Sequence, residues 1–119
     1  MQKHKKMTGQ NSLKTNHLNR VVKTTMFAVN EYFEGKVKSL AFHVGDDDAT
    51  VGVMAAGEYE FGTGTIEHMT LISGKMSVML PGKAQWQPIT VNETFTVEAN
   101  VNFKVKIDEE SAYLCVYKK

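Results

Sequence analysis

Short apolar segments recur about every ten residues from Met26 to the C-terminus, and turn residues separate each segment from the next. Several segments alternate apolar and polar residues, as in "ETFTVE" and "VNFKVKI". A period of two residues is typical of β-strands that bury one face, and no stretch has the period of an amphipathic helix. Roughly eight to ten strands predict an all-β fold, built as an antiparallel double sheet that is closed or nearly closed.

Glycines and acidic residues predict where the strands end. Gly35 follows a first short strand, "GDDD" at 45–48 is predicted to form the solvated tip of a hairpin, and Gly57 begins another strand. "SGK" around Gly74 fits a tight hairpin with a positive φ at the glycine, which predicts two strands in "EHMTLISGKMSVML". "VNFKVKI" and "AYLCVY" are predicted to be two separate strands.

The length and composition fit one small domain. The chain has 119 residues, of which 42% are hydrophobic, which is enough for one modest core. It contains no apolar run long enough to span a membrane, and its first residues are polar where a signal peptide is apolar, so we expect a cytoplasmic protein. The single cysteine, Cys115, lies in "AYLCVY", where it is either a small buried hydrophobe or a reactive thiol.

Charge is distributed unevenly between residues 1–25 and residues 26–119. The first 25 residues carry five lysines and Arg20 without an acid, which predicts a basic, disordered N-terminal extension. A basic arm that contacts nucleic acid and a natural start at Met26 are the two alternatives. Residues 26–119 have eight lysines, thirteen acidic residues and no arginine, so this domain is not expected to bind nucleic acid.

The segment "GEYEFGTGTIEHMTLISG" has the frame of a small β-barrel motif that normally carries two histidines before a glutamate. Here Glu67 is present, but the positions six and four residues before it hold Phe61 and Thr63. Strand geometry places Glu67 on the same face as Met69 and Leu71, so we expect it to point inward. An exposed glutamate at the start of a strand is the alternative.

Metal ligands are too few for a metal site. Only His43 and His68 occur after Met26, and they lie in different segments without a short ligand spacing. His68 is expected on the face of its strand opposite Glu67. We therefore expect no bound metal and no cofactor.

The alternation of "AYLCVY" puts Tyr113, Cys115 and Tyr117 on one face, where the tyrosines either line a lumen or pack in the core.

A family resemblance follows from several of these segments. "NEYFEGKVKSLAF", "ATVGVMAAGEYEFGT", "MTLISGKMSVMLPG", Trp86 and "AYLCVY" occur in this order. In these segments the chain closely resembles the small single-domain cupins assigned as pyrimidine/purine nucleoside phosphorylases. The resemblance implies a cupin-type antiparallel β-barrel, or jelly roll, over residues 26–119, and a homodimer. It also implies phosphorolysis of adenosine, guanosine, inosine, cytidine, uridine, thymidine and xanthosine to the free base and pentose 1-phosphate. One departure is Glu98, where the family commonly has proline.

Phosphorolysis assigns tasks to the candidate residues. Phosphate is the co-substrate, and without arginine in the domain we expect Lys104, Thr63 and the amides near Gly62 and Gly64 to hold it. Glu67 is the catalytic candidate, since a carboxylate can offset the oxocarbenium charge or bind the ribose hydroxyls. The base is expected to stack on an aromatic wall of Tyr59, Phe61, Phe103, Tyr113 and Tyr117. The alternative function is a non-catalytic cupin that binds a small metabolite.

Overall fold

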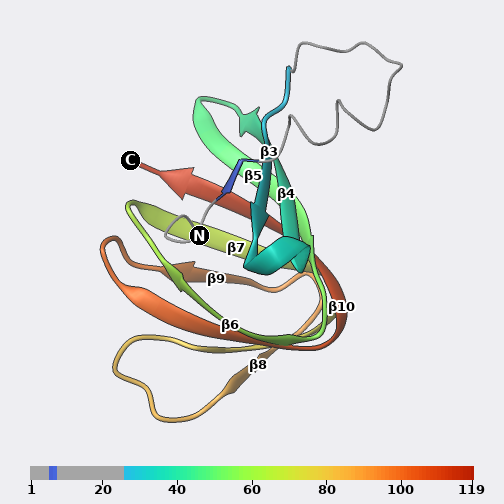
Figure 1. The fold of residues 1–119 in the computed structure, drawn as a ribbon. Helices are drawn as coiled ribbons and strands as arrows, with labels where there is room; N and C mark the ends of the chain where they lie inside the picture. The colour runs from blue at the N-terminus through green and yellow to red at the C-terminus, as the bar shows by residue number, and fades with distance from the viewer. Residues whose placement is uncertain (1–5, 8–25) are drawn as a thin grey trace.

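The computed structural model describes residues 6–7 and 26–119 and confirms the all-β prediction (Figure 1). The strands are β1 (Lys6–Met7), β3 (Val29–Tyr32), β4 (Val37–Val44), β5 (Asp47–Met54), β6 (Gly57–Gly62), β7 (Ile66–Met79), β8 (Gln87–Ile89), β9 (Thr94–Val97) and β10 (Asn102–Lys118). One turn of 3-10 helix, η1 (Phe33–Gly35), joins β3 to β4. In the described part of the chain, no helix is long and apolar enough to cross a membrane.

The two longest strands, β7 and β10, hold the sheet together. The N-terminal half of β7 pairs with β9, and its C-terminal half pairs with β8. The N-terminal half of β10 pairs with β6, and its C-terminal half pairs with β5. The strand order is β1-β3-β4-β5-β10-β7-β8, with every described pair antiparallel. The sheet curls over an apolar interior (Figure 1) but does not close, because β1 and β8 end the strand order without pairing with each other.

The predicted hairpin at Gly74 is wrong. Gly74 does have a positive φ of 106°, but β7 continues through it as one strand. The register between β7 and β10 shifts beside it, and Ser111 Oγ accepts a hydrogen bond from the Lys75 amide at 3.1 Å. A positive-φ glycine in a strand gives a bulge that bends the strand, so the chain changes direction without reversing. The C-terminal segments are likewise one bent strand, β10.

The hairpin between β4 and β5 agrees with the predicted acidic tip. Its turn residues are Gly45 and Asp46, while Asp47 and Asp48 belong to β5. At the tip, the His43 imidazole lies 3.1 Å from an exposed Asp48 oxygen. The Lys118 ammonium donates to Asp47 Oδ2 at 2.7 Å, which ties the end of β10 to this hairpin. The prediction of a disordered extension falls outside the described residues, apart from the two residues of β1, which pair with β3.

Candidate functional site

Register places three polar side chains in one row across the sheet: two of them are buried, and the third, Asp48, is exposed at the hairpin tip. Asp48 of β5 is the ladder partner of Tyr117 in β10, which is in turn the partner of Glu67 in β7. The next inward row contains Thr50 and Cys115. Because cross-strand partners lie about 5 Å apart, these rows form a contiguous polar region on an otherwise apolar face.

Glu67 points into the protein, as expected, and its residue has no exposed surface. The alternative of an exposed carboxylate at the strand start is therefore excluded. The Cys115 thiol donates to Glu67 Oε1 at 3.3 Å. Burial raises the pKa of this thiol well above its usual range, and the neighbouring carboxylate raises it further. The thiol thus stays protonated and serves as a hydrogen-bond donor, not as a nucleophile.

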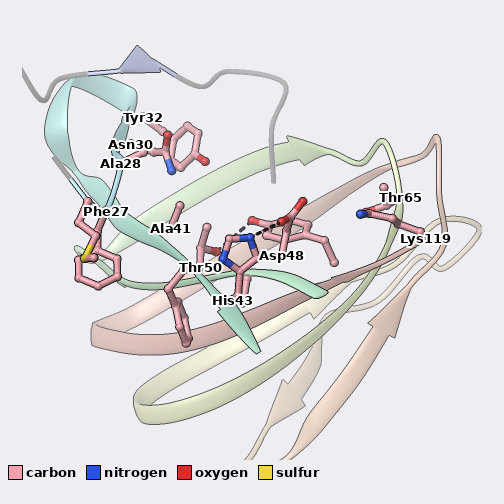
Figure 2. A pocket seen from close by; sticks show the side chains of 14 residues that line it. Phe27, Ala28, Asn30, Tyr32, Ala41, His43, Asp48, Thr50, Thr65 and Lys119 are labelled. Carbon is pink, nitrogen blue, oxygen red and sulfur yellow. Dashed lines mark hydrogen bonds and ion pairs between the residues drawn. The ribbon is translucent and has the colours of Figure 1, made fainter. Parts of the chain in front are cut away.

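A cavity of about 670 Å³ opens beside this polar region (Figure 2). Cavities of roughly 300 to 1,000 Å³ are typical of small-molecule sites, so its size suits a ligand as large as a nucleoside. Its polar lining comes from β3, β4, β5, the β6–β7 connection, β10 and the C-terminal residue: Asn30, His43, Asp48, Thr50, Thr65, Tyr117 and Lys119. Its remaining lining is mostly apolar: Met26, Phe27, Ala28, Tyr32, Ala41, Phe42 and Ala49.

Glu67 lies directly behind the wall of this cavity. Its cross-strand partner Tyr117 lines the cavity, and so does Thr65, which lies in the bend just before β7. Cross-strand partners lie about 5 Å apart, and residues two positions apart in a chain lie at most about 7 Å apart. The carboxylate is therefore next to the cavity while shielded from bulk water, a position in which its charge is poorly screened.

The buried tyrosines of the region are held in their neutral form. Tyr117 Oη and Thr50 Oγ1 share a hydrogen bond of 3.0 Å. Burial raises the pKa of Tyr117 and Tyr113 far above the usual value, and it raises the pKa of Tyr32 to about 12. Nearby Cys115 and Glu67 raise all three further. At neutral pH these hydroxyls can donate or accept hydrogen bonds, but they cannot act as bases.

Three buried polar atoms in the described part of the chain have no hydrogen-bond partner: Asn30 Oδ1, Thr65 Oγ1 and Tyr113 Oη. Two of them, on Asn30 and Thr65, belong to residues that line the cavity. Asn30 is only 4% exposed, and its amide nitrogen makes a long 3.5 Å hydrogen bond to Ser39 Oγ. Unpaired buried polar atoms are uncommon and costly, so their presence in one cavity indicates a polar ligand.

Comparison with known proteins identifies the family of this chain. The family model described as pyrimidine/purine nucleoside phosphorylase matches residues 27–117. A pyrimidine/purine nucleoside phosphorylase from Pseudoalteromonas atlantica is 53% identical over 92 residues, covering 77% of this chain and 99% of that protein. The chain belongs to the pyrimidine/purine nucleoside phosphorylase family.

Solved structures agree with the fold expected for this family. A Vibrio parahaemolyticus protein of unknown function is 41% identical and has a TM-score of 0.75, covering 79% of this chain and 100% of that one. A cupin superfamily protein from Desulfitobacterium hafniense has a TM-score of 0.59 at 14% identity, covering 73% and 81%. At that identity the second likeness concerns the fold alone, and it confirms the cupin-type jelly roll.

Of the aromatic residues suggested for the base, only Tyr117 lines the cavity of this phosphorylase-family chain. Tyr113 is buried two inward rows from Tyr117 on the same strand. The other three pack together: the Phe61 ring is 6.2 Å from Tyr59 and 5.9 Å from Phe103. The Tyr59 hydroxyl donates to the Ala55 carbonyl at 2.6 Å. These three rings form part of the core between β6 and β10.

The residues suggested for phosphate also lie away from the cavity lining. Lys104 is exposed on β10, where its ladder partners are Glu60 and Met79. Thr63 Oγ1 donates to the Glu98 carbonyl at 2.7 Å and accepts from the Val101 amide at 3.1 Å, so its hydroxyl connects two loops. Lys104 is thus on the protein surface, and the Thr63 hydroxyl is bound to backbone groups of a neighbouring loop.

The two positions at which the motif normally carries histidine offer no ligand set for a metal. Phe61 has no donor atom, and the Thr63 hydroxyl is engaged with backbone groups. Among residues 6–7 and 26–119, no three His, Cys, Asp or Glu side chains converge. His43 is at the cavity rim, whereas His68 lies on the other face of β7 with Nδ1 3.0 Å from Thr96 Oγ1. The residues present therefore do not fit the metal site of a metal-binding cupin.

Sequence reasoning did not find several residues of the cavity, namely Asn30, Thr50, Thr65 and Lys119. Thr65 belongs to the same "GTGTIE" segment as Glu67, but it lies in the bend before β7, so strand alternation does not determine where its side chain points. Asn30 follows an apolar residue at the start of a short strand and carries no local signal. Only the pairing of β3, β4, β5 and β10 brings it to this cavity.

Proposed function

We propose that this chain is a nucleoside phosphorylase of broad specificity, a pentosyltransferase that cleaves purine and pyrimidine nucleosides with phosphate. The products are the free base and α-D-ribose 1-phosphate. The proposal is supported by family membership together with one observation: a fully buried carboxylate, Glu67, directly behind a cavity of nucleoside size. Phosphate is the co-substrate, and no cofactor is involved.

The reaction requires charge to develop on the sugar. A phosphate oxygen forms a bond to C1′ as the bond from C1′ to the base nitrogen breaks, and the bonding pair leaves with the base. The base takes up a proton from hydrogen phosphate or water. The transition state has oxocarbenium character, which a nearby anion stabilises more than it stabilises the neutral nucleoside. Glu67 is suited to this task because its charge is shielded from water and close to the cavity.

Phosphate and the base are expected at opposite ends of the cavity, with the sugar between them. Lys118 pairs with Ile66 in the ladder, so the adjacent Lys119 and Thr65 lie near each other, as Figure 2 also shows. An ammonium group and a free hydroxyl suit phosphate. At the other end, Tyr32 and Asn30 lie together, with Phe27 nearby (Figure 2). Phe27 is 51% exposed, which leaves an aromatic surface available to a base without a dense set of directional contacts.

A homodimer is part of this proposal, and the outer face of β4, β5 and β10 supports it. Leu40 and Val51 are ladder partners, and Val51 is also the partner of Leu114. Leu40 is 44% exposed and Val51 is 37% exposed, as is usual for an apolar face that a second subunit covers. Val51→Lys is expected to give monomers in sedimentation velocity, whereas Val91→Lys, at an exposed turn, should not. Monomeric wild-type protein would refute this part.

The direct test is incubation with inosine or uridine, with and without phosphate, followed by chromatography for the free base. Base release that requires phosphate is the expected result, and it should survive a chelator. Thermal stabilisation by nucleoside without any base release would instead support the alternative, a non-catalytic cupin that binds a small metabolite. We expect the reaction in the cytoplasm, where nucleosides and phosphate are both available.

A further inference from the structure

Asn30 offers the cavity a polar group that its own fold leaves unsatisfied. It is 4% exposed, lines the cavity, and its Oδ1 has no partner among the described residues. Its position is fixed by the β3–β4 ladder, in which Ser39 is its direct partner. Beside it, Tyr32 contributes a ring and a hydroxyl that stays protonated at neutral pH. The ligand must therefore present a hydrogen-bonding group at this end of the cavity.

We propose that Asn30 binds a sugar hydroxyl of the nucleoside, namely the 3′-hydroxyl, and that it thereby determines which sugars are accepted. This inference rests on the proposed function. A fixed buried amide in a broad-specificity site must meet a group that all substrates share. Purines and pyrimidines present their N–H groups at different positions, but ribonucleosides and thymidine all carry the 3′-hydroxyl on the same ring.

The chemistry of the amide also favours a hydroxyl. A hydroxyl donates to an amide oxygen, and it can equally accept from an amide nitrogen. It therefore satisfies Asn30 whichever of the two amide atoms faces Ser39. A base edge offers only a donor or only an acceptor at a given atom, so it cannot do the same. A buried polar group built to bind a hydroxyl rejects analogues that lack this hydroxyl.

The test compares inosine with 2′-deoxyinosine, 3′-deoxyinosine and 5′-deoxyinosine in the wild type, Asn30→Ala and Ser39→Ala. Wild-type kcat/KM should fall about 5- to 150-fold for 3′-deoxyinosine, the range expected when one buried polar group loses its partner. In Asn30→Ala, kcat/KM for inosine should fall by a similar factor. The kcat/KM values for inosine and 3′-deoxyinosine should then be equal within threefold. Ser39→Ala keeps the Asn30 amide and should keep the preference.

Three outcomes are decisive. An undiminished preference for the 3′-hydroxyl in Asn30→Ala, or equal losses for all four nucleosides, would overturn the assignment of Asn30. A preference that follows the 2′- or 5′-hydroxyl would overturn the choice of the 3′-hydroxyl. No base release from inosine by the wild type would overturn the proposed function and this inference with it. If Asn30→Ala does not fold by circular dichroism, Asn30→Ser, whose hydroxyl is too short to span the same distance, replaces it.

Discussion

Replacing Glu67 by Gln is expected to lower kcat for phosphorolysis of inosine about 30-fold without unfolding the protein. Glu67 lies behind Tyr117 and Thr65, so a sugar against these residues is about 8 Å from the carboxylate. With an effective dielectric constant of about 20, the attraction between two unit charges at this separation is about 2 kcal/mol. Since the sugar becomes cationic only in the transition state, the loss should appear in kcat at about 1.4 kcal/mol per factor of ten.

The isosteric change separates charge from packing. Glutamine has nearly the same shape, and its amide oxygen can still accept the Cys115 thiol hydrogen bond. Burying an amide costs less than burying a charge, so the thermal midpoint should not fall. Initial rates are measured by chromatography of hypoxanthine at saturating inosine and phosphate. Glu60→Gln, an exposed carboxylate on β6, is the matched control and should keep wild-type rates. A folded Glu67→Gln protein with kcat within threefold of wild type would refute the role of the charge.

Three further predictions concern the structure around the site. Thr50→Val removes the partner of Tyr117 Oη and should lower the free energy of unfolding in urea by about 1 to 3 kcal/mol; no change would mean that the hydroxyl finds another partner. Gly74→Ala puts a Cβ against Ser111 Oγ at a φ of 106° and should lower the free energy of unfolding by at least about 2 kcal/mol in the same assay. Gly82→Ala is the control for backbone strain alone, because Gly82 has a φ of 81° and open space around it. Burial raises the pKa of Tyr117 in the folded state, so the folded protein keeps this proton to higher pH than the unfolded chain does. The resulting contribution to the free energy of unfolding should be fully present below the unfolded tyrosine pKa of 10.0 and should decrease as the pH rises above it. Tyr117→Phe should reduce that loss by about 1.4 kcal/mol per pH unit, and an unchanged slope would contradict the argument.

The faces of the strands could be predicted from the sequence because they depend only on local alternation. Glu67, Cys115 and Tyr113 are buried as the period of two indicated. The conformation of Gly74 was also predicted correctly, but its consequence was not. A positive φ is compatible with a hairpin or with a bulge, and the choice depends on whether β10 pairs with both halves of β7.

The composition of the cavity could not be predicted, since it depends on pairings between distant segments. Asn30 and Thr65 meet the same cavity only because β4, β5 and β10 lie between their strands in the correct register. Lys104 lies on the exposed side of β10, as the alternation that buries Phe103 and Val105 indicates, whereas Lys119 lines the cavity.

Two residues of the motif that contains Glu67 bear on the charge-stabilising role that we propose for its carboxylate. At the first histidine position of the motif, Phe61 is fully buried and its ring packs edge-on against Tyr32 at 6.0 Å. At the second, the Thr63 hydroxyl fixes the loop that leads into β7. The Glu67 carboxylate accepts a hydrogen bond from the Cys115 thiol and has further interactions within the protein. In the function that we propose, the negative charge of this carboxylate acts on the cationic sugar in the adjacent cavity.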